Sequence, residues 1–307
     1  MSEPILVLDV GGTKLAAGIL LDDNTVVSRA ETPTLAEEGG EAVLARLVAL
    51  GRRVLMQAAH EWPALPTPAA VGLASAGYID QAHGVVRFAT DNLPGWTGLP
   101  LSARLQAAFA LPAAVANDAA CFALAEAAVG AGRGYRHVLV VAVGTGVGGG
   151  VVINGVLYSG WEGRAGAIGH LCVEPVNGRP CTCGLGGCLE AYTATRVMVA
   201  ESGYPSIQAL AESYTAGNEE PTVDEAAIWL GRGLATLAHV LGPEAIVIGG
   251  SVGLLGERYL QITHQSFQEH TMPLHQMTPL LPAALGADSG LLGAGILARS
   301  LLQKEDS

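Results

Sequence analysis

Apolar residues gather along this chain in two ways, as short continuous runs and as longer stretches with helical spacing. The short runs are typical of buried strands and lie at residues 5–9, 15–21, 69–74, 113–116, 137–143 and 245–248. The longer stretches predict helices at residues 41–62, 97–109, 119–129 and 291–302. Because strands and helices interleave along the chain, the pattern predicts an α/β fold.

A strand, a glycine-rich turn and a second strand follow one another twice. The first turn carries DVGGTK at residues 9–14, and the second carries GTGVGGG at residues 144–150. Glycine allows a backbone to approach a ligand closely, and the N–H groups of such a turn can hold phosphate oxygens. The repeat predicts a nucleotide between two similar domains, residues 1–118 with a returning helix at about 290–307, and residues 119–289.

Each glycine segment also has a purely structural interpretation. Residues 9–14 suit an ordinary hairpin turn, and Gly249-Gly250-Ser251 suits a simple turn from strand to helix. Residues 144–150 hold five glycines in seven positions, more than a bend needs, which favours a ligand. If the first turn binds phosphate, Asp9 at its edge could position a hydrated Mg²⁺ ion.

Asn117 and Asp118 stand between a predicted strand and a predicted helix. An aspartate there can accept a proton from a hydroxyl while the hydroxyl oxygen attacks phosphorus. The amide of Asn117 can donate and accept hydrogen bonds, which suits sugar hydroxyls. Position alone favours the alternative, a helix N-cap, which is a common role of both residue types.

Three cysteines and a histidine have the spacing of a metal site. Cys181, Cys183 and Cys188 lie in a glycine-rich segment, and His170 upstream completes a Cys₃His set. Four ligands close a tetrahedral zinc shell, so the expected Zn²⁺ is structural rather than catalytic. A redox-active thiol pair and a coincidental cluster are the alternatives. Glu190 follows this segment and could be held toward a ligand or could simply begin a solvated helix.

Composition narrows the class of protein. A chain of 307 residues suggests about two domains, and its net charge of −12 disfavours nucleic acid and anionic membranes as partners. We expect no membrane span, because the apolar stretches are interrupted before the roughly 20 residues that a span requires. The five cysteines and the absence of a basic-apolar leader predict a reducing, cytoplasmic compartment.

Taken together, the motifs resemble the ROK family of sugar kinases and repressors, within the hexokinase and actin-like ATPase superfamily. The resemblance runs nearly end to end, and it rests on DVGGTK, DNLPGW at residues 91–96, VANDA around Asp118, GTGVGGG, and GHLCVEP…CTCGLGGCLEAY at residues 169–192. It implies a two-domain actin-like ATPase or hexokinase-type fold with a nucleotide and sugar cleft between the domains. It also implies ATP as phosphoryl donor, Mg²⁺, a structural Zn²⁺ and a homodimer.

The resemblance gives each matching position a role. Asp118 would be the catalytic base for the 6-hydroxyl of the sugar. Residues expected to bind the sugar are Asn92, Asn117, His170, Glu190 and the Ser75-Ala76-Gly77 turn. Residues expected to bind the nucleotide or its metal are Asp9, Gly11, Gly12, Thr13, Lys14, Thr145, Gly146, Gly249 and Gly250. The zinc ligands would be His170, Cys181, Cys183 and Cys188.

One departure bears on the substrate. The family commonly has Glu where this chain has Ala167, and the bacterial N-acetylmannosamine kinases, which this chain resembles most, also vary there. We therefore expect phosphorylation of an N-acetylated hexosamine, first N-acetylmannosamine, with N-acetylglucosamine kinase and glucokinase as alternatives. A sugar-responsive DNA-binding regulator is disfavoured, because DVGGTK begins at residue 9 and leaves no room for a helix-turn-helix domain. A non-catalytic sugar-binding protein is disfavoured by the intact Asp9 and Asp118.

Overall fold

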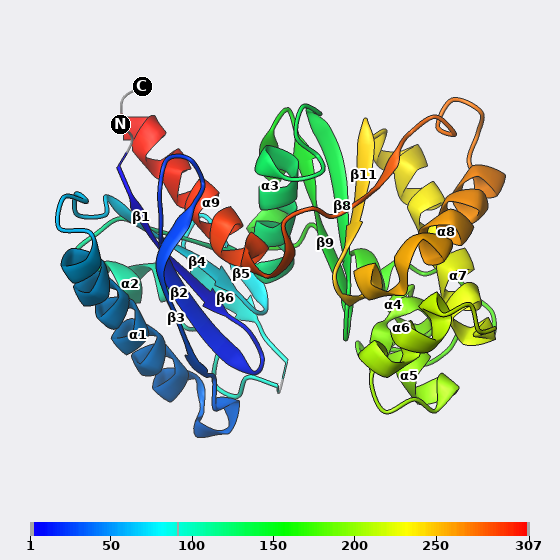
Figure 1. Cartoon of the computed structure of the whole chain (residues 1–307), viewed down its shortest axis with the longest axis horizontal. Coiled ribbons are helices and arrows are strands. Elements are labelled where there is room, and N and C mark those ends of the chain that lie inside the picture. The colour runs from blue at the N-terminus through cyan, green and yellow to red at the C-terminus, as the bar shows by residue number, and fades with distance from the viewer. Residues whose placement is uncertain (1–2, 91, 306–307) are drawn as a thin grey trace. The chain divides into compact units, whose positions relative to one another are not determined.

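The computed structural model of the chain describes residues 3–90 and 92–305 (Figure 1). Asp91, the first residue of the DNLPGW motif, lies outside these residues. The chain divides into two compact units: unit 1 is Met1–Ala125, Ser159–Ala165 and Leu285–Ser307, and unit 2 is Glu126–Tyr158 and Gly166–Ala284. The domain boundaries expected from the sequence, at residues 118 and about 290, stay predictions.

Unit 1 is built on a sheet with the strand order β3-β2-β1-β4-β7. Its strands are β1 (Ile5–Val10), β2 (Lys14–Leu20), β3 (Val26–Pro33), β4 (Ala70–Ser75) and β7 (Ala113–Asn117). β1, β2 and β3 pair antiparallel, whereas β1, β4 and β7 pair parallel. In this register Val10 lies beside Ser75 and Ser75 lies beside Asn117, so the carboxyl ends of three strands meet at one edge.

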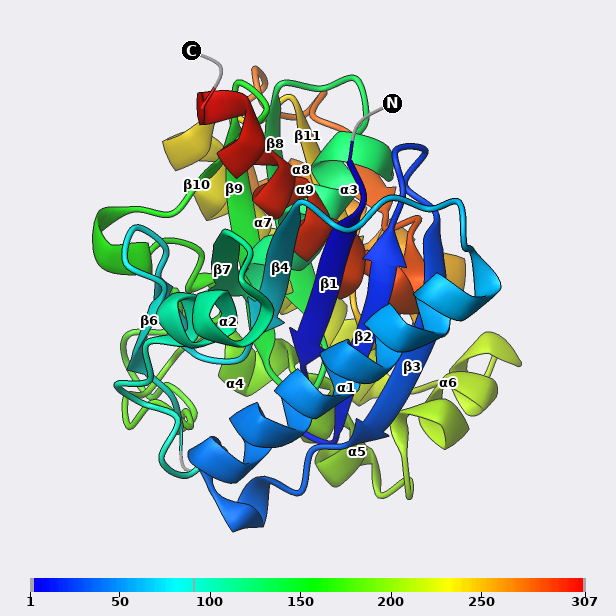
Figure 2. The same cartoon turned by 90° about the vertical axis from the view of Figure 1, so that its left-hand side faces the viewer.

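Side chains that alternate along β1 separate the two helical layers of unit 1. Leu6 and Leu8 pack in one cluster with helices α1 (Gly40–Glu61) and α2 (Leu101–Phe109). Figure 2 shows α1 crossing in front of β1, β2 and β3. Ile5 and Val7 point the other way and pack with residues of α3 (Asp118–Val129) and α9 (Ser289–Glu305). Since side chains in a strand alternate with period two, Asp9 belongs to this second face.

A hairpin of β5 (Tyr78–Asp80) and β6 (Val85–Phe88) follows β4. The buried Asp80 carboxylate accepts hydrogen bonds from Arg87, at 2.5 Å, and forms an ion pair with His83 at 2.9 Å. Arg87 also lies 3.5 Å from Glu162, in the short 3₁₀ segment Trp161–Gly163. These contacts hold the Ser159–Ala165 segment of unit 1 against the hairpin.

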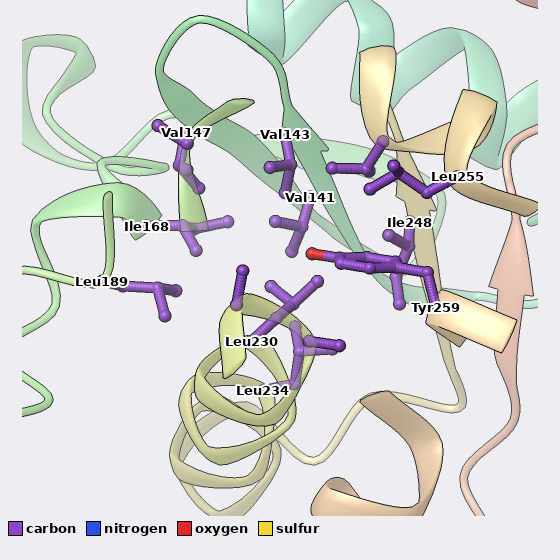
Figure 3. Close-up of a cluster of buried hydrophobic side chains, with 14 of the residues drawn as sticks. Val141, Val143, Val147, Ile168, Leu189, Leu230, Leu234, Ile248, Leu255 and Tyr259 are labelled. Carbon is purple, nitrogen blue, oxygen red and sulfur yellow. The ribbon is translucent and has the colours of Figure 1, made fainter. Parts of the chain in front are cut away.

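Unit 2 repeats the strand arrangement with the order β10-β9-β8-β11-β12. Its strands are β8 (His137–Val143), β9 (Val147–Ile153), β10 (Val156–Tyr158), β11 (Ala245–Gly249) and β12 (Leu280–Pro282). Its helices are α4 (Glu190–Thr193), α5 (Thr195–Ser202), α6 (Ile207–Thr215), α7 (Pro221–Leu241) and α8 (Gly256–His270). Figure 3 shows Val141 and Ile248 of the sheet packing toward Leu230 of α7 and Tyr259 of α8.

The α/β class predicted from the sequence is confirmed. The strands and helices expected in unit 1 are present, but α2 begins at Leu101 rather than at residue 97. Residues 97–100 are not helical. The Thr97 hydroxyl accepts a hydrogen bond from the Ala89 N–H, and Pro100 comes directly before the helix. The sequence analysis did not anticipate β3, β5, β6, β10, β12 or helices α5 to α8. Among the described residues, no helix is long and apolar enough to cross a membrane.

The contact between α9 and β4 generates a prediction. A Cβ atom on Gly72 would lie 2.1 Å from the carbonyl oxygen of Ala294, which the helix backbone holds in place. Overpacking of this kind costs about 1–3 kcal/mol. Gly72→Ala should therefore lower the melting temperature by on the order of 5 °C in a thermal unfolding scan.

Gly253→Ala is the matched control, because a Cβ atom there meets nothing within 4 Å. Equal melting temperatures for the two variants would contradict the close packing of α9 on β4.

Candidate active site

The parallel strand ends of unit 1 bring together several residues singled out in the sequence. Asn117 ends β7 and caps α3: its side-chain oxygen accepts hydrogen bonds from the N–H groups of Ala119, at 2.9 Å, and Ala120, at 3.2 Å. Its amide nitrogen donates to the carbonyl oxygen of Gly77 at 2.9 Å. The capping role that the sequence left open is therefore present, and the same side chain fixes the Gly77 turn.

Asp118 is the first residue of α3. Its Oδ1 accepts a hydrogen bond of 2.8 Å from the Ala119 N–H. The surrounding protein raises the pKa of Asp118 and this backbone hydrogen bond opposes the increase. The residue is nevertheless exposed to solvent, and water limits the increase further. A carboxylate that is accessible and has a raised pKa is suited to accept a proton.

Asp9 lies on the α3 and α9 face of the same sheet. A Cβ atom on Gly290 of α9 would lie only 2.9 Å from an Asp9 carboxylate oxygen. Burial raises the pKa of Asp9 to about 7, the negative charge of Asp118 adds to the increase, and the charges of Lys14 and Arg29 oppose it. A carboxylate whose charge the surrounding protein disfavours is suited to bind a cation in place of its proton.

A pocket of about 200 Å³ lies in unit 1. Gly11 and Gly12 of the first hairpin, Gly77 and Asn92 line it. The remaining lining residues are mostly apolar: Ala76, Tyr78, Phe88, Ala89, Thr90 and Leu93. The structure thus places two predicted sugar residues and two predicted phosphate residues at one pocket.

Trp96 of the DNLPGW motif helps to shape one wall of this pocket. Trp96 is fully buried, and its indole N–H donates a 3.0 Å hydrogen bond to the Ser75 hydroxyl. That hydroxyl donates in turn to the carbonyl oxygen of Ala76. The motif therefore shapes the Ser75-Ala76-Gly77 turn. Lys14, by contrast, pairs with Glu31 at 2.8 Å on the exposed side of β2.

The second glycine hairpin lies at the carboxyl ends of β8 and β11 in unit 2. Because these strands are parallel, with Gly249 beside Ala142, the exposed Thr145 and Gly146 share this edge with Gly250. The Gly144 N–H donates to the carbonyl oxygen of Gly146 at 2.8 Å and closes the turn.

Two hydroxyl residues lie at the same turn, and only Ser251 belongs to a segment that the sequence analysis singled out. The Thr195 N–H donates to the carbonyl oxygen of Gly144 at 2.8 Å, and its hydroxyl lies 3.3 Å from that of Ser251. Because Thr195 begins α5 far along the chain, no spacing in the sequence marks it.

Glu190 is buried at the start of α4. This excludes the alternative from the sequence analysis that Glu190 begins a solvent-exposed helix. Its carboxylate accepts hydrogen bonds from the Val147 N–H at 2.9 Å, the Thr182 hydroxyl at 2.7 Å and Arg196 at 3.0 Å. Burial alone would raise the pKa of Glu190, but these hydrogen bonds and the charge of Arg196 outweigh it and lower the pKa. Thr182 and Arg196 carried no signal in the sequence.

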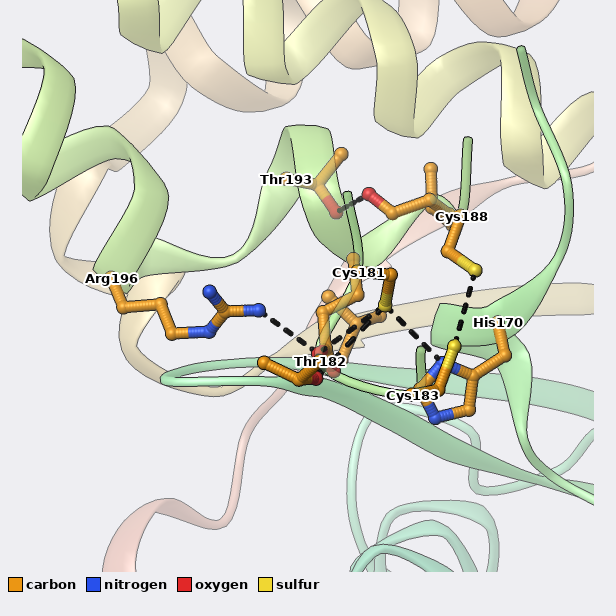
Figure 4. Close-up of polar contacts among 10 residues, drawn as sticks. His170, Cys181, Thr182, Cys183, Cys188, Thr193 and Arg196 are labelled. Carbon is orange, nitrogen blue, oxygen red and sulfur yellow. Dashed lines mark hydrogen bonds and ion pairs between the residues drawn. The ribbon is translucent and has the colours of Figure 1, made fainter. Parts of the chain in front are cut away.

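The four expected zinc ligands converge (Figure 4). Their ligand atoms all lie within 4.8 Å of one another, with 3.8 Å between His170 Nδ1 and Cys181 Sγ and 3.6 Å between Cys183 Sγ and Cys188 Sγ. Zn–S bonds of about 2.3 Å in a tetrahedron separate the ligands by about 3.8 Å. These distances and the Cys₃His donor set fit a tetrahedral zinc ion.

Comparisons with known proteins agree along the whole chain. The ROK family profile matches residues 5–301. The chain is 33% identical to a glucokinase of Halalkalibacterium halodurans, over 98% of this chain and 95% of that protein. It is 34% identical to an N-acetylmannosamine kinase of Escherichia coli, over 96% of this chain and 98% of that protein. The solved structure of a glucokinase of Streptomyces griseus with glucose and AMPPNP superposes on this chain with a TM-score of 0.80. The sequence identity is 30%, and the match covers 97% of this chain and 99% of that one.

The raised pKa of the half-buried Asp9 generates a prediction on pH dependence. Because the folded state raises the pKa of Asp9, it binds more protons than the unfolded state between about pH 4 and pH 7. The free energy of unfolding should therefore fall as the pH rises through this window. Asp9→Asn cannot lose a proton, so its melting temperature relative to the wild type should rise by on the order of 5 °C between pH 5 and pH 8.

Asp23→Asn makes the same chemical change at an exposed turn, where a hydrogen bond from the Thr25 N–H lowers the pKa of Asp23, so this variant should run parallel to the wild type between about pH 5 and pH 8. If Asp9→Asn also ran parallel to the wild type, the inference about Asp9 would be wrong.

Proposed function

This chain belongs to the ROK family, and from that premise we propose that it phosphorylates the 6-hydroxyl of an N-acetylated hexosamine, with N-acetylmannosamine as the first candidate. Its relatives include both glucokinases and N-acetylmannosamine kinases, so phosphoryl transfer from ATP to a sugar is the chemistry of this chain. Identities of 33% and 34% do not separate the two substrates, and glucokinase is the alternative with equal support.

The observation that carries the choice of an N-acetylated sugar is the apolar lining of the unit 1 pocket. Ala76, Phe88 and Ala89 stand beside Gly77 and Asn92, two of the proposed sugar contacts. A methyl group is favourable against such a lining, whereas a bare hydroxyl there would lose its hydrogen bonds to water. Ala167 supports the same choice: it is exposed and lacks the carboxylate that the family commonly directs at the sugar.

In the proposed mechanism Asp118 accepts the proton of the 6-hydroxyl as the hydroxyl oxygen attacks the terminal phosphorus of ATP. Its solvent access and raised pKa support this role. The amide of Asn117 keeps the Gly77 turn in place, and Asn92, His170 and Glu190 are further proposed contacts of the sugar. Exclusion of water and correct orientation supply much of the catalysis in such transfers.

The nucleotide is assigned to the glycine turns. In this proposal Gly11, Gly12 and Thr13 contact the transferred phosphoryl group, and Thr145 and Gly146 hold the other phosphates through backbone N–H groups. Gly249 and Gly250 lie by the nucleoside. Asp9 would hold Mg²⁺ through its water ligands, and that ion would neutralise phosphate charge.

We assign a structural Zn²⁺ to His170, Cys181, Cys183 and Cys188. The distances among these atoms support it, and four protein ligands leave no position for a substrate. With Nδ1 of His170 on the metal, Nε2 is left for a sugar oxygen. Well under one zinc per chain in the purified protein would contradict the assignment. We further propose that the protein acts in the cytoplasm as a homodimer and that nucleic acid is not one of its partners.

The catalytic base can be tested directly. Asp118→Asn keeps the size and the capping oxygen of the side chain but cannot accept the proton. Turnover should fall roughly 10²- to 10⁴-fold in an ADP-release assay, with the melting temperature nearly unchanged. Asp23→Asn is the control for the chemical change. Near-normal turnover of Asp118→Asn would exclude Asp118 as the base.

The substrate can be tested with a panel of glucose, N-acetylglucosamine and N-acetylmannosamine, each with ATP and Mg²⁺. We expect the highest kcat/KM on N-acetylmannosamine. Ala167→Glu restores the carboxylate common in the family, and it should shift the ratio of kcat/KM toward glucose by about 10-fold, the effect of one hydrogen bond to a charged group. A clear glucose preference of the wild type would refute the N-acetylated substrate but leave the kinase intact.

A further inference from the structure

One buried carboxylate contacts both the glycine hairpin and the metal loop of unit 2. Glu190 Oε2 accepts a hydrogen bond from the Val147 N–H, at the end of the hairpin turn. Glu190 Oε1 accepts hydrogen bonds from the Thr182 hydroxyl and from Arg196. The two oxygens of one rigid group therefore face two different structural segments.

On the hairpin side, the carboxylate limits the position of the turn. A Cβ atom on Gly146 would lie 2.8 Å from Glu190 Oε2, so this oxygen occupies the space beside the turn that a side chain at residue 146 would need. The Thr195 N–H anchors the opposite arm of the turn through the carbonyl oxygen of Gly144. Any rotation of the Glu190 carboxylate must move the Gly146 backbone or release the Val147 N–H.

On the metal side, Thr182 stands between two of the proposed ligands, Cys181 and Cys183, and its hydroxyl donates a 2.7 Å hydrogen bond to Glu190. Glu190 itself follows the ligand Cys188 by two residues. Figure 4 shows Thr182 lying between Arg196 and the cysteines. The backbone on both sides of the carboxylate is thus tied to a ligand of the metal.

We propose that Thr182 and Glu190 couple metal occupancy to nucleotide affinity, with Arg196 as a positioning residue that holds the carboxylate. The proposal rests on the function assigned above. Without the metal, the Cys181–Cys183 segment is released and the Thr182 hydroxyl leaves Glu190. The carboxylate then turns toward Arg196, and the hairpin that holds the phosphates loses its fixed acceptor at Val147.

Thermodynamic linkage makes the coupling measurable from both directions. If the metal tightens nucleotide binding by some factor, the nucleotide must tighten metal binding by the same factor. We expect a factor of about 10, within the usual range for coupled sites. A nucleotide should therefore also slow the transfer of zinc to a chelator.

The experiment measures AMPPNP affinity by calorimetry with zinc-loaded and zinc-depleted protein, and zinc transfer to a chromogenic chelator with and without AMPPNP. In the wild type, depletion should weaken AMPPNP about 10-fold, and AMPPNP should slow zinc transfer. In Thr182→Val, which retains all four ligands, both effects should shrink below about 2-fold. Thr182→Ser keeps the hydroxyl and should retain them, as should Thr236→Val, a control at an exposed site on α7.

The possible results of these measurements distinguish a failure of the coupling from a failure of the proposed function. Wild-type protein that binds zinc and AMPPNP independently, or Thr182→Val with undiminished coupling, would overturn the coupling alone. Protein without zinc or without AMPPNP binding would instead contradict the proposed function. If zinc depletion or Thr182→Val unfolds the protein, the chelator measurement on zinc-loaded wild type still tests the coupling, because zinc transfer that AMPPNP does not slow would overturn it.

Discussion

The in-register parallel pairing of β1, β4 and β7 is the constraint on which the chemistry of unit 1 depends. It places Val10, Ser75 and Asn117 side by side, so that the residues next to them, Asp9 and Asp118, come to one sheet edge although more than a hundred residues separate them. The alternation of side chains along β1 then turns Asp9 to the α3 and α9 face. A shift of one residue in β1 would send this carboxylate to the opposite, apolar layer.

The second layer is fitted closely around this edge. Gly72 lets the backbone of α9 rest on β4, and Gly290 leaves room for the Asp9 carboxylate at the start of the same helix. The buried Trp96 acts from the other side by holding the Ser75 hydroxyl, and so the turn that leads to Gly77. The helix that returns from the end of the chain thus completes the environment of a residue near its beginning.

The sequence predicted the features that depend on local order. The apolar runs identified the central strands, glycine identified both turns, and cysteine spacing identified the residues that converge as the zinc cluster. It could not predict Thr182, Thr195 or Arg196, because their roles arise from contacts between segments with no fixed spacing. Helices α5 to α8 were also missed, because the sequence analysis followed the motifs and these helices lie between them. Asn117 shows a further limit of prediction from sequence. Its position correctly indicated a helix cap, but its hydrogen bond to the carbonyl oxygen of Gly77 is evident only from the structure.

Each glycine hairpin has an acid beside it, half-buried Asp9 in unit 1 and buried Glu190 in unit 2, and the pKa values of the two acids are shifted in opposite directions. Asp9 lies in protein that disfavours its charge, so its pKa rises and a cation can replace its proton. Glu190 receives hydrogen bonds from a backbone N–H, a hydroxyl and a guanidinium, so its pKa falls and it stays an anion. An acid that stays charged and accepts hydrogen bonds at both oxygens is suited to hold a turn in place, whereas an acid whose charge the surrounding protein disfavours is suited to bind a metal ion that arrives with the substrate. The similar backbone of the two hairpins therefore carries different chemistry, because the side chains around each acid, rather than the turns themselves, decide its charge.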